Sequence, residues 1–392
     1  MASLRIGIIG IGNMGSAHVS TITAGKIKDL TLGAVCDLRQ ERLDFCKEKQ
    51  PDVVCYENWK DLIQDPDIQA VLIAVPHPMH ADIAMAALAA GKHVLTEKPV
   101  DIKISKARQL NECAAAHPEL VFGIMFNQRT NPLFQKAREI VRSGVLGQLQ
   151  RTVWIITNWY RTQFYYNSGT WRATWSGEGG GVLLNQCPHQ LDLWQWICGM
   201  PTQVTAFCDI AKYHDIEVED DVTIFTRYEN GATGSFITST GEFPGTNRLE
   251  ISGTRGKIVL ESGMLKWWKL KEDVMQHLTT AGKGAPDPEV EYEEYIPDTP
   301  AAGHAGILQN FTNAVLYGEQ LLAPGTDGIF ELTISNAAYL SAWTGNSVVN
   351  LPLDTAAFDE KLADLAEQSR LRQNPASEAI NTEYRARWQV QW

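Results

Sequence analysis

The first residues of the chain combine a strand-like run with a glycine pattern. Residues 5–9 (RIGII) are mostly apolar and β-branched, as in a buried strand, and Gly10, Gly12 and Gly15 follow directly. In such a strand–turn–helix, the first glycine permits a tight turn and the second lets a pyrophosphate approach the backbone. The third glycine lets the helix pack closely against the strand. The helix expected from Asn13 would direct its first N–H groups toward the phosphates. This stretch therefore predicts a dinucleotide-binding site.

A second strand-like run, residues 30–36 (LTLGAVC), ends directly before Asp37. In dinucleotide-binding chains, an acidic residue about 20 positions after the glycines accepts hydrogen bonds from the ribose hydroxyls. A carboxylate at this place would repel the 2′-phosphate of NADP, so the sequence favours NAD. Arg39 stands two residues further on and could bind that phosphate, which keeps NADP as the alternative.

Length, charge and cysteine content restrict the remaining possibilities. A chain of 392 residues exceeds one ordinary domain, which predicts two. The net charge of −12 argues against a nucleic-acid partner, because binding nucleic acid requires a basic face. The seven cysteines are odd in number and include no C-x-x-C pair, so we expect neither a disulfide framework nor a metal site. With no signal peptide and no apolar run of ~18 residues, we expect a cytoplasmic protein without a membrane partner.

The order of strand-like and helical segments predicts two different sheets. Strands and helices alternate over residues 1–128, which favours an α/β Rossmann domain with a doubly wound parallel sheet. Over residues 129–355, strand-like runs follow one another with turns between them. This order predicts an α+β domain with a large, mostly antiparallel open sheet. Residues 356–392 are expected to add a C-terminal helix and a tail.

Several later segments carry weaker signals. Residues 281–304 are acidic and rich in proline and glycine, which predicts a surface loop. Residues 304–318 and 331–345 have helical periodicity, and both helices are expected to pack under the antiparallel sheet. The tail carries Trp388 and Trp392, which suggest docking on the same or a neighbouring subunit.

Residues 74–99 (AVPHPMHADIAMAALAAGKHVLTEKP) carry a resemblance to a known family. Together with Asn127 and Arg129 in an Asn-x-Arg pattern, they resemble the glucose-fructose oxidoreductase and inositol dehydrogenase family (Gfo/Idh/MocA). The resemblance covers about residues 4–352 and implies an NAD(P)-dependent oxidoreductase of sugars and polyols. It also implies a homodimer or homotetramer that assembles through the outer face of the second-domain sheet.

The Glu97-Lys98-Pro99 triplet follows a strand of the first domain. Strand ends of an open parallel sheet form the ligand crevice, and a lysine ammonium there can stabilise a developing oxyanion. The resemblance implies that Lys98 is catalytic and that a cis peptide precedes Pro99. Glu97 is expected to position the turn and the cofactor. A solvated surface lysine is the alternative.

In the second domain, the glycines at 179–181 lead into a predicted helix on which Asn185, His189 and Asp192 follow at helical spacing, hence on one face. The family motif is Asp-x-x-x-His, so an asparagine stands here where aspartate is usual. Histidine can take and return a proton near neutral pH. We therefore expect His189 to be the general base beside Lys98 and Asn185 to orient a substrate hydroxyl, while Asp192 is expected to be structural.

The loop before this helix is crowded with aromatic side chains: Trp159, Tyr160, Tyr165, Tyr166, Trp171 and Trp175. Sugar rings stack on such side chains, and polar neighbours can meet their hydroxyls. The predicted substrate-binding residues are Lys98, Asn158, Tyr160, Arg161, Gln163, Trp171, Asn185 and His189. The predicted cofactor-binding residues are Gly10, Ile11, Gly12, Asn13, Met14, Asp37, Val75, Pro76, His80, Glu97, Lys98, Asn127, Trp171 and Arg172. His304 is a further candidate for lining the cleft.

These residues predict an NAD-dependent sugar or glycoside dehydrogenase. Hydride would pass between a pyranose carbon and the nicotinamide while Lys98 and His189 handle the hydroxyl proton. The choice of C3 rests on analogy with aromatic-rich relatives. One alternative is an NAD-dependent glycosidase that oxidises C3 transiently, eliminates the C1 substituent and reduces the ketone again. A remote alternative is an NAD-binding sensor without catalysis.

Overall fold

The predicted first strand, β1 (Leu4–Ile9), is a central strand of a parallel sheet in the computed structural model, which describes residues 3–369. Within these residues the sheet has six strands in the order β3-β2-β1-β4-β5-β6, and every neighbouring pair is parallel. This order is that of the Rossmann fold, so the predicted doubly wound sheet is confirmed. The other strands are β2 (Leu30–Cys36), β3 (Val54–Tyr56), β4 (Ala70–Ile73), β5 (His93–Thr96) and β6 (Phe122–Ile124).

The strands of this sheet are joined mainly by helices, as parallel neighbours require. The α-helices are α1 (Asn13–Thr23), α2 (Gln40–Lys49), α3 (Trp59–Gln64), α4 (His80–Ala89) and α5 (Ile104–Ala116). Short 3₁₀ turns are η1 (His77–Met79), η2 (Asn127–Thr130) and η3 (Gly325–Asp327). Apart from β3, most strand residues of this sheet are buried, which explains why β4 (AVLI) is a continuous apolar run rather than an alternating one.

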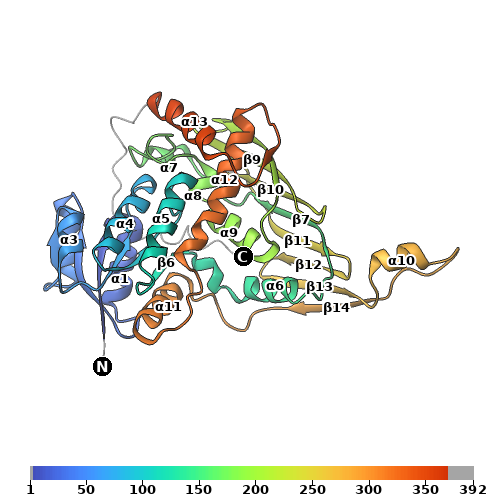
Figure 1. Ribbon diagram of the computed structural model, residues 1–392, viewed down its shortest axis with the longest axis horizontal. Coiled ribbons are helices and arrows are strands. Elements are labelled where there is room, and N and C mark those ends of the chain that lie inside the picture. The colour runs from blue at the N-terminus through green and yellow to red at the C-terminus, as the bar shows by residue number, and fades with distance from the viewer. Residues whose placement is uncertain (1–2, 370–392) are drawn as a thin grey trace. The chain divides into compact units, whose positions relative to one another are not determined.

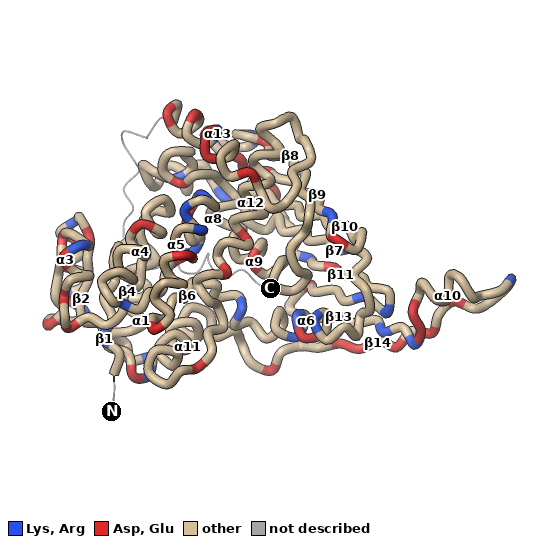
Figure 2. Tube along the Cα trace, in the orientation of Figure 1, with Lys and Arg blue, Asp and Glu red and all other residues tan. Residues whose placement is uncertain are grey.

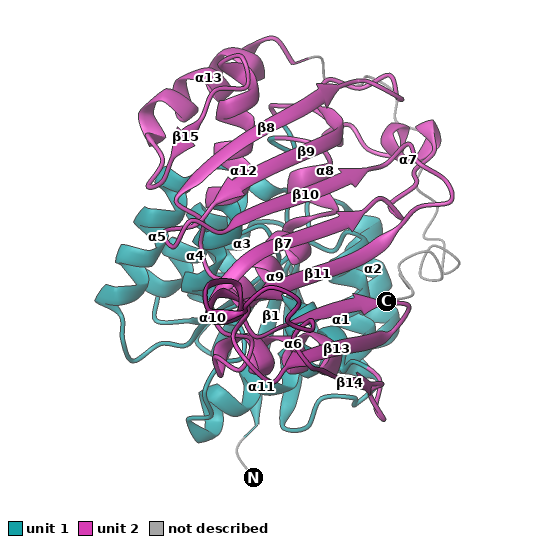
Figure 3. Ribbon diagram, turned by 90° about the vertical axis from the view of Figure 1, so that its right-hand side faces the viewer, with its two compact units in different colours: residues 1–130, 177–179, 301–332 teal, residues 131–176, 180–300, 333–392 magenta. Residues whose placement is uncertain are grey.

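Figure 1 labels the helices and strands of the described residues. These residues form two compact units, which Figure 3 shows in different colours. Unit 1 takes in residues 3–130, 177–179 and 301–332, and unit 2 takes in the remainder up to residue 369. The sequence predicts contiguous domains with boundaries after residues 128 and 355, whereas each unit is formed from separate segments of the chain.

Helix α11 (Gly303–Tyr317) belongs to unit 1 and contacts β1 and η2. The expectation that this helix packs under the antiparallel sheet was therefore wrong. Its segment is fixed to unit 1 by backbone and side-chain contacts: the Ile124 N–H donates to the Ala323 carbonyl at 3.0 Å. The buried Arg129 guanidinium donates to Asp327 at 2.7 Å.

The sheet of unit 2 has nine strands within the described residues, in the order β14-β13-β12-β11-β7-β10-β9-β8-β15. Figure 3 shows several of these strands side by side. All neighbouring pairs are antiparallel except β7 with β10, so the predicted mostly antiparallel sheet is confirmed. The strands are β7 (Leu149–Ile156), β8 (Gln203–Ile210), β9 (Glu219–Arg227), β10 (Thr233–Ser239), β11 (Asn247–Gly253), β12 (Gly256–Glu261), β13 (Met264–Leu270), β14 (Val290–Tyr295) and β15 (Val349–Asn350).

Alternate side chains of each strand point to the same face of the sheet, and one of the two faces is buried. Trp154 and Phe236 lie on that face with their ring centroids 6.1 Å apart, and Trp194 of α9 packs on Phe236. The helices of unit 2 are α6 (Pro132–Arg142), α7 (Gln163–Asn167), α8 (Val182–Asn185), α9 (Pro188–Cys198), α10 (Val274–Thr280) and α13 (Thr355–Glu367). Helix α12 (Gly328–Trp343) begins in unit 1 and ends in unit 2.

Two expectations for unit 2 need correction. The single helix expected from residue 182 to residue 192 is broken after Asn185, because Pro188 opens α9 and cannot supply a helical N–H. Residues 281–304 are not all loop: β14 lies within them and pairs with β13 at the edge of the sheet, while α10 lies between the two strands. Figure 2 shows acidic residues along β14, where exposed glutamates include Glu291, Glu293 and Glu294.

The opposite face of β8 and β9 exposes Phe207 and Phe225, each about half accessible. Self-association through this sheet stays a prediction. Trp388 and Trp392 lie outside the described residues.

Candidate functional site

The glycine loop joins β1 to α1 at the point where the strand order of unit 1 reverses. Gly10 has a φ of 89°, and a Cβ atom there would lie 2.5 Å from the Ala74 carbonyl oxygen after β4. A Cβ atom on Gly15 would lie 1.9 Å from the carbonyl oxygen of Gly10. At Gly12, by contrast, nothing lies within 4 Å of a Cβ atom. The loop thus has two glycines required by its own packing and one facing open space, which fits a pyrophosphate approaching at Gly12.

Asp37 follows β2 and holds the glycine loop from the side. Its Oδ2 atom accepts the Ile11 N–H at 2.8 Å, and its Oδ1 atom accepts the Arg39 N–H at 3.0 Å. The Arg39 Nε also lies 3.3 Å from Oδ1, so this guanidinium faces the carboxylate. Each carboxylate oxygen has two lone pairs, so Oδ2 keeps one that can accept a ribose hydroxyl. The arrangement fits the ribose of NAD, because the Arg39 guanidinium, which could bind the 2′-phosphate of NADP, instead faces the Asp37 carboxylate.

His80 connects the turns that follow β4 and β5. Its Nε2 atom lies 2.8 Å from the Val75 carbonyl oxygen, and its Nδ1 atom lies 2.6 Å from the Pro99 carbonyl oxygen. Burial lowers the pKa of His80, and the two carbonyl contacts act in the opposite direction. The ring therefore supports the predicted cofactor segment at Val75 and Pro76. The Lys98–Pro99 peptide is cis, as the resemblance implied.

Glu97 is buried beside three side chains of unit 1. Its Oε1 atom lies 2.7 Å from Nε2 of His18 on α1. Burial by itself would raise the pKa of Glu97. The hydrogen bond and charge of His18, with the charges of His304 and Lys98, outweigh it and lower this pKa to about 2. Glu97 is thus an anion next to Lys98, and its Oε2 atom accepts the Lys98 backbone N–H at 3.3 Å.

His304 and Asn127 extend this cluster. The Asn127 Nδ2 atom lies 3.0 Å from Nδ1 of His304, and the His304 ring meets the His18 ring edge-on at 5.6 Å. Burial lowers the pKa of His304 to about 4. The Asn127 Oδ1 atom is buried and has no hydrogen-bond partner among the described residues, so it can accept a donor from a ligand. Sequence reasoning missed His18, because a single histidine on an otherwise ordinary helix gives no motif.

In unit 2, the Tyr165 hydroxyl joins several predicted residues. It accepts hydrogen bonds from Arg172 Nη1 at 2.8 Å and from Gln186 Nε2 at 3.0 Å. It donates to Asn185 Oδ1 at 3.3 Å. The Arg172 guanidinium also lies over the Tyr165 and Trp171 rings, at 4.6 and 5.0 Å from their centroids. Asn185 is therefore held by a buried polar network, and Gln186, which no motif indicated, is part of it.

The other predicted substrate residues occupy the loop before α7. The Arg161 guanidinium lies over the Trp159 and Tyr165 rings, while the half-exposed Tyr160 packs against Phe243. The Asn158 Oδ1 atom is buried with no hydrogen-bond partner within residues 3–369.

Three predicted residues take supporting or separate positions. The Gln163 side chain bonds Asn167 and the Asp215 backbone, so it holds the loop. His189 is the second residue of α9 and is partly exposed. Asp192 is buried and accepts a hydrogen bond from Gln195 at 3.0 Å, which fits its expected structural role. The two members of the predicted proton relay, Lys98 and His189, lie in different units.

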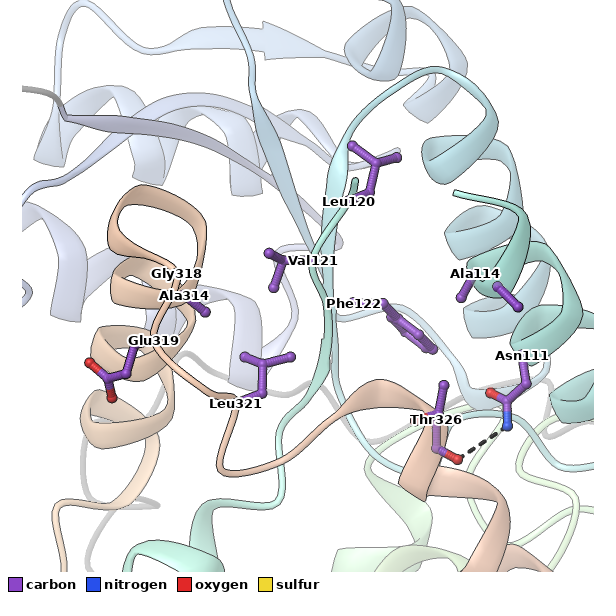
Figure 4. Close-up of a pocket in the computed structure, with 11 residues that line it drawn as sticks. Asn111, Ala114, Leu120, Val121, Phe122, Ala314, Gly318, Glu319, Leu321 and Thr326 are labelled. Carbon is purple, nitrogen blue, oxygen red and sulfur yellow. Dashed lines mark hydrogen bonds between the residues drawn. The ribbon is translucent and has the colours of Figure 1, made fainter. Parts of the chain in front are cut away.

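A cavity of about 460 Å³ lies elsewhere in unit 1, between α5, β6 and α11 (Figure 4). Leu120, Val121 and Phe122 line it, and Asn111 donates to the Thr326 carbonyl at its rim. It contains none of the predicted site residues. Across residues 3–369 there is no cluster of three or more histidine, cysteine or acidic side chains suited to a metal ion. In the same range, no helix is both long and apolar enough to cross a bilayer.

The glycine loop gives a matched pair of substitutions. We expect Gly15→Ala to destabilise the protein by several kcal/mol, because its methyl group would collide with a backbone carbonyl. Gly12→Ala should leave the melting temperature nearly unchanged yet weaken NADH binding by at least about tenfold, since its methyl group enters the space open to a pyrophosphate. Thermal unfolding and NADH titration would measure both. Normal NADH affinity in Gly12→Ala would contradict the placement of the pyrophosphate.

His304 gives a pH-dependent prediction. Its pKa is lowered from 6.5 to about 4, so its contribution to stability is present above pH 6.5 and is lost as the pH falls through 4. The loss is at most about 3 kcal/mol. We expect wild type to lose more stability than His304→Gln between these pH values, as measured by urea unfolding. Parallel pH profiles for the two proteins would contradict the lowered pKa.

Comparison with known proteins identifies both domains. Residues 4–124 match the oxidoreductase family with an NAD-binding Rossmann fold, and residues 134–259 match the GFO/IDH/MocA C-terminal domain. Myo-inositol 2-dehydrogenase of Thermotoga maritima is 27% identical over 352 residues, which cover 88% of this chain and 98% of that protein. Levoglucosan dehydrogenase of Pseudarthrobacter phenanthrenivorans is 28% identical over 297 residues, which cover 66% of this chain and 74% of that protein.

Solved structures share the fold at lower identity. Levoglucosan dehydrogenase in complex with NADH and levoglucosan has a TM-score of 0.74 at 22% identity, covering 89% of this chain and 100% of that one. The WlbA dehydrogenase from Bordetella pertussis, in complex with NADH and UDP-GlcNAcA, has a TM-score of 0.74 at 22% identity and covers 90% and 100%. Because both domain matches agree with the glycine loop, Asp37 and the cis Lys98–Pro99 turn, this chain belongs to the GFO/IDH/MocA family and is an NAD-dependent oxidoreductase.

Proposed function

We propose that the protein is an NAD-dependent dehydrogenase that oxidises a ring hydroxyl of a sugar or polyol, with C3 of a pyranose as the reacting carbon. The main support is the arrangement in unit 1. There the glycine loop, Asp37 and the turn carrying Lys98 all follow the carboxyl ends of parallel strands. The names of two relatives, a myo-inositol dehydrogenase and a levoglucosan dehydrogenase, support a cyclic polyhydroxylated substrate.

The nucleotide would be bound by the residues already described in unit 1. The backbone at Gly10 and Gly12 and the N-terminus of α1 face the pyrophosphate, and Asp37 accepts the ribose hydroxyls. Bound NAD supplies an acceptor for the hydride that leaves the substrate carbon. Asn127 offers a buried carbonyl oxygen to a donor of the ligand.

The protein's own chemistry is the transfer of one proton. We assign His189 as the general base that takes the hydroxyl proton, while the Lys98 ammonium hydrogen-bonds the same oxygen and stabilises its developing negative charge. As the C–H electron pair leaves with hydride, the oxygen forms the ketone double bond. The anionic Glu97 beside Lys98 favours the charged ammonium.

Side chains of unit 2 would orient the substrate. Asn185 is held by the Tyr165 hydroxyl, so its carboxamide would orient a neighbouring substrate hydroxyl. The aromatic rings of Trp171 and Tyr160 are the candidates for stacking on the sugar face. Because Asn185 carries no charge, His189 has no carboxylate from this position to raise its basicity.

The activity itself can be measured with a panel of myo-inositol, levoglucosan, glucose and aryl glucosides. We expect NADH absorbance to rise in proportion to substrate consumed, with NAD preferred over NADP. Release of the aryl group from a glucoside with only a catalytic trace of NAD, and no accumulation of NADH, would support the glycosidase instead. Turnover with none of these compounds under either assay would contradict the proposal.

The proton relay makes a separate prediction. Lys98→Met and His189→Ala should each lower kcat by about 10²–10⁴, with NADH affinity nearly unchanged. The double variant should lose much less than the product of the two effects, because both groups act on one oxygen. Lys106→Met, at an exposed lysine on α5 paired with Asp82, is the matched control and should retain full activity. Strictly multiplicative losses would refute a shared site of action.

A further inference from the structure

The first two residues of β9, Glu219 and Asp220, are consecutive carboxylates with no exposed surface. Consecutive strand residues point to opposite faces of a sheet, so these two side chains serve different surroundings. We propose that they are positioning residues with separate effects. Glu219 fixes α8, which carries Asn185. Asp220 fixes the loop before α7, which carries the predicted sugar-binding residues Asn158, Tyr160 and Arg161. This inference rests on the proposed function of Asn185 and of that loop.

Glu219 holds the start of α8. Its Oε2 atom accepts the Gly181 N–H at 2.8 Å, and its Oε1 atom accepts the Leu183 N–H at 2.9 Å. The Tyr339 hydroxyl of α12 donates to the same Oε1 atom at 2.7 Å. Helix α8 ends only two residues later at Asn185. A carboxylate bound by three donors therefore fixes the short segment from which Asn185 projects.

The glycines before α8 are explained by this contact. A Cβ atom at Gly181 would lie 2.0 Å from the Glu219 carbonyl oxygen, and one at Gly180 would lie 2.1 Å from the Tyr339 hydroxyl. The chain can approach Glu219 and Tyr339 this closely only without side chains. The glycine run therefore serves packing against β9 and α12, which favours one position of α8.

Asp220 holds the turn before β9. Its Oδ1 atom accepts the Lys212 N–H at 2.9 Å, while its Oδ2 atom accepts the backbone N–H groups of Tyr213 and His214 at 2.9 and 3.0 Å. The His214 Nδ1 atom lies 2.8 Å from the same Oδ2 atom. The imidazole is thus held at one edge by the buried carboxylate.

The other edge of the His214 ring contacts the loop before α7. Its Nε2 atom lies 2.9 Å from the Arg161 carbonyl oxygen, and the Tyr166 ring packs on it at 4.7 Å. The Arg161 N–H donates to the Thr240 carbonyl at 2.9 Å, and the Thr240 N–H donates to the Asp220 carbonyl at 2.9 Å. The backbone at Arg161 is therefore held by two links, and the one through His214 depends on the Asp220 carboxylate.

The two anchored segments meet at one buried hydrogen bond. Tyr165 lies in α7, directly after the loop that is held through Asp220, and Asn185 lies in α8, which Glu219 holds. The Tyr165 hydroxyl donates to the Asn185 Oδ1 atom at 3.3 Å. A carboxamide in place of either carboxylate keeps the volume but presents an NH₂ group to backbone N–H donors. Each substitution should loosen mainly the segment that its own carboxylate holds, because Asn185 also accepts a hydrogen bond from the Gln186 Nε2 atom at 3.4 Å.

The test compares Glu219→Gln with Asp220→Asn, using the best substrate of the panel. Burial raises the pKa of Glu219 to about 7, so kinetics are measured well above that pH. Glu219→Gln should lower kcat by about 10- to 100-fold with KM for the sugar within about twofold, since Asn185 is displaced. Asp220→Asn should raise that KM about tenfold with kcat within about twofold. NADH affinity should be unchanged in both.

A second readout does not depend on turnover. Trypsin cleaves after arginine, and cleavage after Arg161 requires the loop to open locally. Asp220→Asn should make this bond more sensitive than in wild type, whereas Glu219→Gln should not. Tyr339→Phe and His214→Phe are milder variants that should follow Glu219→Gln and Asp220→Asn respectively, should either carboxamide fail to fold. The same kinetic change in both carboxamide variants, or equal trypsin sensitivity, would overturn the inference.

Asn185→Ala separates this inference from the proposed function. If it lowers kcat while Glu219→Gln does not, the positioning role fails and the role of Asn185 stands. If Asn185→Ala leaves kcat unchanged, the proposed role of Asn185 fails, and the positioning role that rests on it fails with it.

Discussion

Buried or partly buried carboxylates that accept backbone N–H groups fix the segments on which this protein depends. An ionised carboxylate is costly to bury unless its oxygens are hydrogen-bonded, so each one constrains the backbone around it. Asp37 does this for the glycine loop, Glu219 for the start of α8 and Asp220 for the turn before β9. Glu97 is the exception, since its main partner is the His18 side chain. The positions of these segments therefore depend on hydrogen bonds to carboxyl groups as well as on apolar packing.

The architecture could be predicted from the sequence because both sheets leave periodic signals. Buried parallel strands appear as apolar runs and most antiparallel strands alternate, so the type of sheet in each unit was predicted correctly. The predictions failed where the local pattern does not determine tertiary contacts. The periodicity of α11 shows that one face is apolar but not which sheet that face meets. The run at β14 is exposed along most of its length and so carries no hydrophobic pattern. Pro188 should have indicated the break between α8 and α9.

The residues of the candidate site likewise fall into two groups: those that the sequence indicates and those that come together only in the folded chain. Gly10 and Asp37 could be named in advance because their spacing reflects a local requirement, whereas Lys98 and Asn185 were named through the family resemblance. His18 contacts Glu97 from 79 positions away, and Glu219 reaches Gly181 across 38. Such contacts exist only after the chain has folded, and a single sequence gives no sign of them.

The two borders of the nine-stranded sheet have a consequence for assembly. One edge strand is β15, which is only two residues long, and the other is β14, which carries several glutamates. Neither offers a long, neutral row of free amide and carbonyl groups on which a strand from another molecule could add. Lateral polymerisation of the kind that seeds amyloid is disfavoured at both edges, although Phe207 and Phe225 on the sheet face between them stay exposed.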